Sequence, residues 1–153
     1  MCDLLCEVTK SLCQILCCYN RKSYGTLLPP GVELPRHPQG ITTEFLTTAF
    51  HSYGTYEAHV KVESVKILKA PRTGLLSDIH RFTYTLSDPD LPTPKPCFVK
   101  FAPLQLKTRV TTDMFKMGET EISFYNSIQS DFPMNTPKCL FADIDHTTKT
   151  YVL

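Results

Sequence analysis

Apolar residues recur with the period of an α-helix in three parts of the chain. Residues 2–18 place leucine, isoleucine and valine side chains on one broad face. A second pattern has Thr42 as a candidate N-cap and Gly54 as a natural stop. A third helix is predicted to start at an Asp113 cap and to end before Pro133. The apolar stripe of the second helix comprises Phe45, Leu46, Ala49 and Phe50, and that of the third Met114, Met117, Phe124, Tyr125 and Ile128.

Elsewhere the apolar residues follow the two-residue period of β-strands. In the segment 79–86, Phe82 and Tyr84 share one face while polar residues share the other. The chain closes with a predicted hairpin that turns near Asp145–Thr148. Runs of strands and helices without regular alternation predict an α+β fold with a five-stranded antiparallel sheet and one packed helix, preceded by N-terminal helices. The predicted strands are residues 59–70, 79–86 and 97–103 and the two strands of the closing hairpin.

Composition narrows the classes of function. The 153 residues are 42% hydrophobic and 20% charged, which is typical of a globular domain. A formal net charge of +1 argues against a nucleic-acid partner. No run of about 20 apolar residues predicts a membrane span. Seven cysteines, an odd number, without a convincing secretory signal favour reduced thiols and a cytoplasmic location.

Residues 1–40 are predicted to form a leader, an amphipathic cysteine-bearing helix followed by a proline-rich segment. Four cysteines flank the apolar face of the helix, and three interpretations of them stay open: plain packing, a zinc site, or lipidation. Palmitate on Cys17 and Cys18 would bring peripheral membrane contact and a membrane-associated location. The segment 26–40 is either a linker or an ordered strap. The flanking cysteines are Cys2, Cys6, Cys13 and Cys17.

Glu121 and Lys100 are the residues whose chemistry the pattern makes unusual. In helical projection Glu121 lies about 20° from Met114, in the centre of the apolar stripe, whereas Glu119 points about 140° away and is expected in solvent. A carboxylate on a buried face needs a cation. Lys100, in the apolar strand FVKF, is the candidate, so the two side chains are predicted to meet in an apolar interior.

A third candidate element is the turn before the second strand. Its residues are Gly74, Leu75, Leu76 and Ser77. Gly74 permits tight backbone geometry and Ser77 adds a hydroxyl group, and amides exposed in such a turn can hold phosphate oxygens. The order along the chain is therefore a glycine-bearing turn, a strand with a lysine, and a helix with a glutamate.

This order resembles the N-terminal lobe of the protein-kinase-like superfamily. The segments GLLSDIHRFTYTL, FVKFAP, ETEISFYNSI and TPKCLFADID look like the branch of choline kinases and aminoglycoside phosphotransferases. They are most similar to the ecdysteroid kinase-like (CHK kinase-like) family, whose Glu-x-x-Phe-Tyr motif reads here Glu121 to Tyr125. The resemblance covers residues 41–153.

The resemblance implies that the chain binds ATP. Lys100 would hold the α- and β-phosphates, and Glu121 would orient Lys100. The turn from Gly74 to Ser77 would cover the phosphates, and Phe98 would lie at the roof of the adenine pocket. The implied activity is Mg²⁺-dependent phosphoryl transfer to a small hydroxylated acceptor.

In the family, the catalytic aspartate and the Mg²⁺ ligands lie in a C-terminal lobe. Residues 41–153 are interpreted as an N-terminal lobe truncated at the hinge, with no catalytic or metal residue of its own and an acceptor only if a C-terminal lobe is present. The acidic run from Asp143 to His146 is assigned a turn role. Two alternatives stay open: a non-catalytic kinase-like fragment that acts as a binding or membrane-associated module, and an unrelated α+β domain with a structural ion pair.

Overall fold

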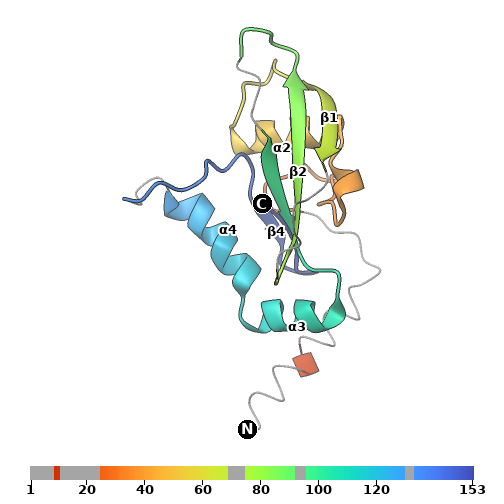
Figure 1. Ribbon diagram of the computed structural model, residues 1–153, viewed down its shortest axis with the longest axis vertical. Coiled ribbons are helices and arrows are strands. Elements are labelled where there is room, and N and C mark those ends of the chain that lie inside the picture. The colour runs from red at the N-terminus through yellow and green to blue at the C-terminus, as the bar shows by residue number, and fades with distance from the viewer. Residues whose placement is uncertain (1–8, 11–24, 69–74, 92–95, 130–132) are drawn as a thin grey trace.

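The computed structural model describes residues 9–10, 25–68, 75–91, 96–129 and 133–153 (Figure 1). Within the leader, Thr9 and Lys10 are helical. All the cysteines of the leader, and with them the zinc and lipidation interpretations, lie outside the described residues. Gly74 of the phosphate-covering turn also lies outside them.

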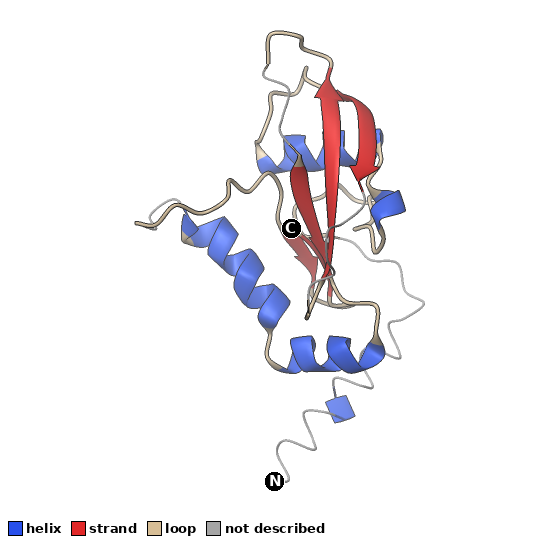
Figure 2. Ribbon diagram, viewed as in Figure 1, coloured by secondary structure: helices blue, strands red, loops and turns tan. Residues whose placement is uncertain are grey.

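Five antiparallel strands form one sheet, which confirms the α+β class and the predicted sheet (Figure 2). The strand order is β1-β2-β3-β5-β4, so the closing hairpin joins the sheet beside β3. In that hairpin Ile144 pairs with Tyr151, and the turn lies where the sequence places it. The strands are β1 Val62–Leu68, β2 Asp78–Leu86, β3 Cys97–Phe101, β4 Asp143–Asp145 and β5 Thr150–Val152.

Helix α2 (Thr43–Tyr53) begins and ends at the predicted residues. The Thr42 hydroxyl oxygen accepts a hydrogen bond from the Phe45 amide at 3.1 Å, which satisfies one of the unpaired donors of the first turn. Gly54 adopts the left-handed conformation, with φ of 75°, that a residue without a Cβ tolerates. The whole predicted stripe of this helix is buried against one face of the sheet.

The proline-rich segment packs on the same face as α2. Leu28 and Leu34 are buried in the core cluster that α2 and the sheet share, and the short 3-10 helix η1 (Pro38–Gly40) leads into α2. Asp143 fixes the start of the segment by accepting hydrogen bonds from the amides of Thr26 and Leu27. Residues 25–40 are therefore an ordered strap.

The helix predicted to start at Asp113 corresponds to α4 (Met117–Ser127), and α3 (Leu106–Met114), which precedes it, was not predicted. The prediction of a single helix capped by Asp113 is wrong, because Lys116 adopts a left-handed conformation with φ of 50° and breaks the helix. Figure 1 shows α3 and α4 at an angle to each other, with α4 beside the sheet.

The buried residues of α4 are Gly118 and Ile122, not the predicted stripe. Ile122 packs with Ile144 and Tyr151 on the face of the sheet opposite α2, whereas Met117 and Ile128 are exposed. The prediction failed because the stripe took its phase from Met114, which belongs to α3, and so missed the face of α4 that carries Gly118 and Ile122. Glu121 consequently lies on the flank of the buried stripe.

Candidate functional site

Lys100 and Glu121 form an ion pair between β3 and α4, as predicted. The Lys100 Nζ donates to a Glu121 carboxylate oxygen at 2.5 Å. The prediction that the pair lies in an apolar interior is wrong, however, because the Lys100 side chain is 27% exposed and that of Glu121 33% exposed. The pair lies at the edge of a hollow, where solvent or a ligand can reach it. An ammonium group has three N–H donors, and the contact with Glu121 uses one of them.

The position of Lys100 follows from the alternation of β3. Val99 and Phe101 are buried in the α2 core, so the residue between them must face the opposite side. The Lys100 backbone also exchanges two hydrogen bonds with Leu153, at 2.8 and 3.1 Å. A lysine anchored in the middle strand of a sheet has a well-defined backbone position, and the carboxylate of Glu121 fixes its ammonium end.

A hollow of about 590 Å³ adjoins the pair, between the sheet and the start of α4. Its polar lining consists of Lys100, Glu121, Ser77 and Thr120. The remaining lining is apolar and mostly aromatic, from Leu76, Phe115, Met117, Phe124, Tyr125 and Tyr151. A cation among aromatic walls, with hydroxyl groups nearby, suits an anionic ligand that also carries a flat apolar part.

The structure brings four of the predicted site residues together and leaves two apart. Leu76 and Ser77 line the hollow with Lys100 and Glu121, and Ser77 is buried. Leu75 is 91% exposed, and Phe98 is 64% exposed on the Lys100 side of β3 without lining the hollow.

Two tyrosines of the hollow were not anticipated as site residues. Burial first, and then the negative charge of Glu121, raises the pKa of Tyr151 to about 12. The same two causes raise the pKa of Tyr125 above its usual value. Both phenols therefore stay protonated at neutral pH. The sequence motif of the helix contains Tyr125. No sequence pattern, however, fixed the strand register of β5 that brings Tyr151 to the hollow.

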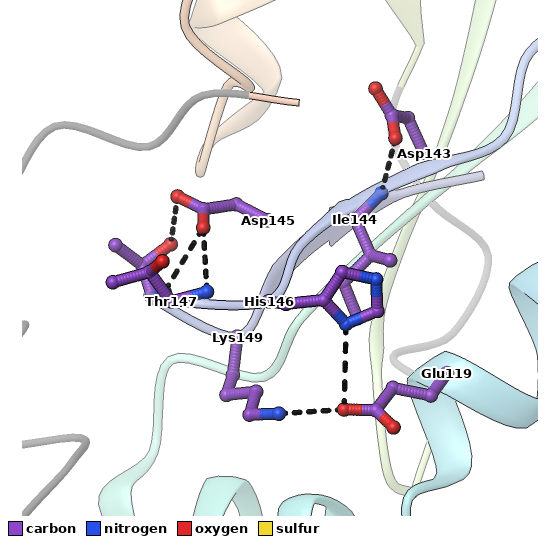
Figure 3. A network of polar contacts seen from close by, with 8 residues as sticks. Glu119, Asp143, Ile144, Asp145, His146, Thr147 and Lys149 are labelled. Carbon is purple, nitrogen blue, oxygen red and sulfur yellow. Dashed lines mark hydrogen bonds and ion pairs between the residues drawn. The ribbon is translucent and has the colours of Figure 1, made fainter. Parts of the chain in front are cut away.

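A second ion pair joins α4 to the closing hairpin (Figure 3). Lys149 Nζ donates to a Glu119 carboxylate oxygen at 2.6 Å, and His146 Nδ1 lies 3.8 Å from the same oxygen. The prediction that Glu119 is solvated is wrong. The hydrogen bond from Lys149 is the main cause that holds the pKa of Glu119 below its ordinary value.

Within the acidic run Asp145 has the predicted turn role, whereas Asp143 lies in β4 and binds the strap. Asp145 accepts hydrogen bonds from the amides of Thr147 and Thr148 and from the Thr148 hydroxyl (Figure 3). Asp143 is 1% exposed, and it accepts from the strap and from its neighbour Ile144. Within the described ranges, no three histidine, cysteine or acidic side chains are grouped so that they could hold a metal ion.

Comparisons of the chain with protein-family models, with curated proteins and with solved structures found no match. Across the part of the chain that the structure covers, no helix combines the length and apolarity that a membrane span requires. A function for the chain therefore has to be argued from the geometry of the site.

Proposed function

We propose that this chain is the nucleotide-binding lobe of an ATP-dependent kinase that acts on a small hydroxylated molecule. In this proposal Lys100 binds the α- and β-phosphates of ATP and Glu121 holds Lys100 in place. The observation that carries the proposal is the 2.5 Å ion pair from β3 to α4 at the edge of a hollow. It joins a lysine and a glutamate that the family resemblance had already assigned to phosphate binding.

The size and lining of the hollow support a ligand of this class. Its volume of about 590 Å³ lies in the range of small-molecule sites, about 300–1,000 Å³. Ser77 and Lys100 both line the hollow, so a hydroxyl and an ammonium are available for phosphate oxygens. The exposed ring of Phe98, two residues before Lys100 on the same side of β3 and therefore about 7 Å away, offers a stacking surface for adenine.

The described residues fit a phosphate group but not its metal ion. The Lys100 ammonium is paired with Glu121, but it has further N–H groups that can donate to phosphate oxygens. In the described segments no set of acidic side chains is arranged to hold Mg²⁺. When bound, Mg²⁺ would neutralise charge on the phosphates during transfer. The proposal therefore assigns nucleotide binding to these residues and leaves the transfer step to residues elsewhere.

Thermal unfolding with and without ATP tests the proposal. Ligand that binds the folded chain raises its melting temperature by mass action. We expect ATP to raise the melting temperature of the wild-type chain, and Lys100→Ala to weaken ATP binding at least about tenfold, since a charge-assisted contact contributes about 1.5–3 kcal/mol. Lys66→Ala is the matched control, because Lys66 is an exposed lysine on β1.

Glu121→Gln separates the two roles of the pair. It keeps the shape of the side chain but removes the charge that orients Lys100, so ATP binding should weaken less than in Lys100→Ala. Equal temperature shifts in the wild type and Lys100→Ala, or no shift in either, would refute nucleotide binding. The ion pair would then have a structural role only.

A further inference from the structure

Two glutamates lie on opposite flanks of the stripe by which α4 contacts the sheet. Taking Gly118 as the origin of the helical projection, Ile122 lies about 40° away, within the stripe. Glu119 lies about 100° to one side and Glu121 about 60° to the other. Each glutamate reaches a lysine: Glu119 contacts Lys149 in the hairpin turn, and Glu121 contacts Lys100 in β3. The two ion pairs thus straddle the contact stripe.

The contact stripe alone does not prevent rotation of α4. At its centre Gly118 has no side chain, and a Cβ built there would lie 2.6 Å from two ring atoms of Tyr151. The helix therefore rests directly on a flat aromatic ring. Such a contact fixes the separation of the two elements but offers few side-chain ridges to fix the rotation of the helix. Directional contacts on both flanks supply that constraint.

We propose that Glu119 and Lys149 are positioning residues that set the rotation of α4, so that the Glu121 carboxylate meets Lys100. The inference rests on the proposed function, because it assigns these residues to the phosphate-binding site without direct contact to the ligand. Rotation of α4 away from Lys149 would carry Glu121 out of reach of Lys100, since the two glutamates belong to one rigid helix.

The hairpin turn that carries Lys149 has a well-fixed backbone, which suits a positioning role. Lys149 has a left-handed conformation, with φ of 55°, at the end of the hairpin turn, and its amide donates to the Asp145 carbonyl at 2.8 Å. Asp145 also fixes the turn through Thr147 and Thr148. The Lys149 and Glu119 side chains are only 20% and 27% exposed, so water screens the pair less than a surface pair.

A double-mutant cycle in the absence of nucleotide tests the coupling of the two ion pairs. The variants are Lys149→Ala, Lys100→Ala and the double variant, and the measurement is the free energy of unfolding in urea. If one pair positions the other, the double variant loses less stability than the two single variants summed. Additive losses would overturn the inference, whatever the chain binds.

ATP titration by calorimetry on the full chain gives the second readout. We expect Lys149→Ala to weaken ATP binding about 3- to 10-fold. The charge-reversed double variant Glu119→Lys/Lys149→Glu keeps the net charge and the pair, and should restore most of the affinity. Lys66→Ala again controls for the loss of one positive charge. A merely structural role would change stability but leave the affinity of the folded chain unchanged.

The outcomes separate this inference from the proposed function. If the wild type binds ATP and Lys149→Ala binds equally well, the positioning role is refuted and the nucleotide site stands. If Lys149→Ala binds weakly and charge reversal restores nothing, Lys149 touches the nucleotide itself, and positioning is again refuted. If the wild type binds no ATP, the proposed function fails, and the double-mutant cycle alone decides whether the two pairs are coupled.

Discussion

The two faces of the sheet are held in different ways. Among the residues that the structure describes, the face covered by α2 and the strap buries fourteen in one apolar and aromatic cluster. The face covered by α4 buries five, and its helix is attached by the ion pairs of Glu119 and Glu121. Burial of apolar area gives most of the stability but little direction, whereas ion pairs and hydrogen bonds give direction and less net stability. The molecule therefore keeps its stability on one face and its candidate site on the other.

Asn126 shows the same principle at the far end of α4. Its side-chain oxygen accepts from the Tyr53 hydroxyl at 3.0 Å, and its amide donates to the Ala142 carbonyl at 3.3 Å. One polar side chain thus links the end of α2, the end of α4 and the residue before β4. The α4 face is fixed by such links at both ends of the helix.

The largest effect is expected on the α2 face. Phe50 is buried in the apolar cluster, with an edge contact to Tyr56 and a tilted ring contact to Tyr84. Phe50→Ala should lower the free energy of unfolding by about 3–5 kcal/mol, measured in urea. The half-exposed Leu104 is the control, and Leu104→Ala should change the free energy by less than about 0.5 kcal/mol. Similar losses in both variants would remove the contrast between the two faces.

The second-largest effect is expected from the hydrogen bonds between the strap and Asp143. Asp143 accepts hydrogen bonds from the Thr26 amide and hydroxyl and from the Leu27 amide. Asp143→Asn turns an NH₂ group toward these donors and should cost about 2–3 kcal/mol in unfolding free energy. Faster protease cleavage within the strap is the second readout. Asp90→Asn, at an exposed loop position, should change neither, and an intact strap in Asp143→Asn would contradict the prediction.

A smaller effect is expected from the glycine of α4. Gly118→Ala places a Cβ 2.6 Å from the Tyr151 ring, which should cost about 1–3 kcal/mol, offset by up to about 1 kcal/mol of helix propensity. The net loss should appear in urea unfolding, together with weaker ATP binding as α4 moves from the sheet. Tyr151→Leu in the same chain should recover part of the loss. A variant more stable than the wild type would mean that the close approach is unimportant.

The smallest effect is the pH dependence of the Glu119 pair. The folded-state pKa of Glu119 is lowered from 4.5, mainly by Lys149, so the pair stabilises the fold above that value. The contribution, about 0.5 kcal/mol for a partly exposed pair, is lost as the pH falls through the lowered pKa. The difference in unfolding free energy between the wild type and Glu119→Gln should therefore shrink as the pH falls below 4.5. A difference independent of pH would contradict this assignment.

Sequence predicted the α2 face best because its signals are local. Thr42 and Gly54 set the ends of α2 by chemistry within one turn of each residue. The alternation of β3 likewise placed Lys100 on the side opposite Val99 and Phe101, although the apolar interior predicted around it is wrong. The pairing of Lys100 with Glu121 was predictable because the apolar strand contained one charge, and the apolar stripe predicted for the helix also contained one.

The α4 face could not be predicted to the same depth. Lys116 separates α3 from α4 although its own residue type does not mark a break, so the helix start was placed at Asp113, inside α3, and α3 itself was not predicted. Glu119 finds Lys149 only because the turn aims that lysine at α4, and the left-handed backbone responsible follows from tertiary structure. Contacts that depend on register and on helix packing leave no periodic trace in the sequence.

The link between Asp143 and the strap also constrains the order in which the chain acquires its structure. Thr26 and Asp143 are 117 positions apart, so their hydrogen bond cannot form during synthesis until the closing hairpin has left the ribosome. Leu28 and Leu34 belong to the same buried cluster as Phe141 and Val152, so this cluster is complete only when those late residues have been made. The strap is thus made early but fixed late by Asp143. Between these two events its leucines can be bound by chaperones or by other copies of the chain.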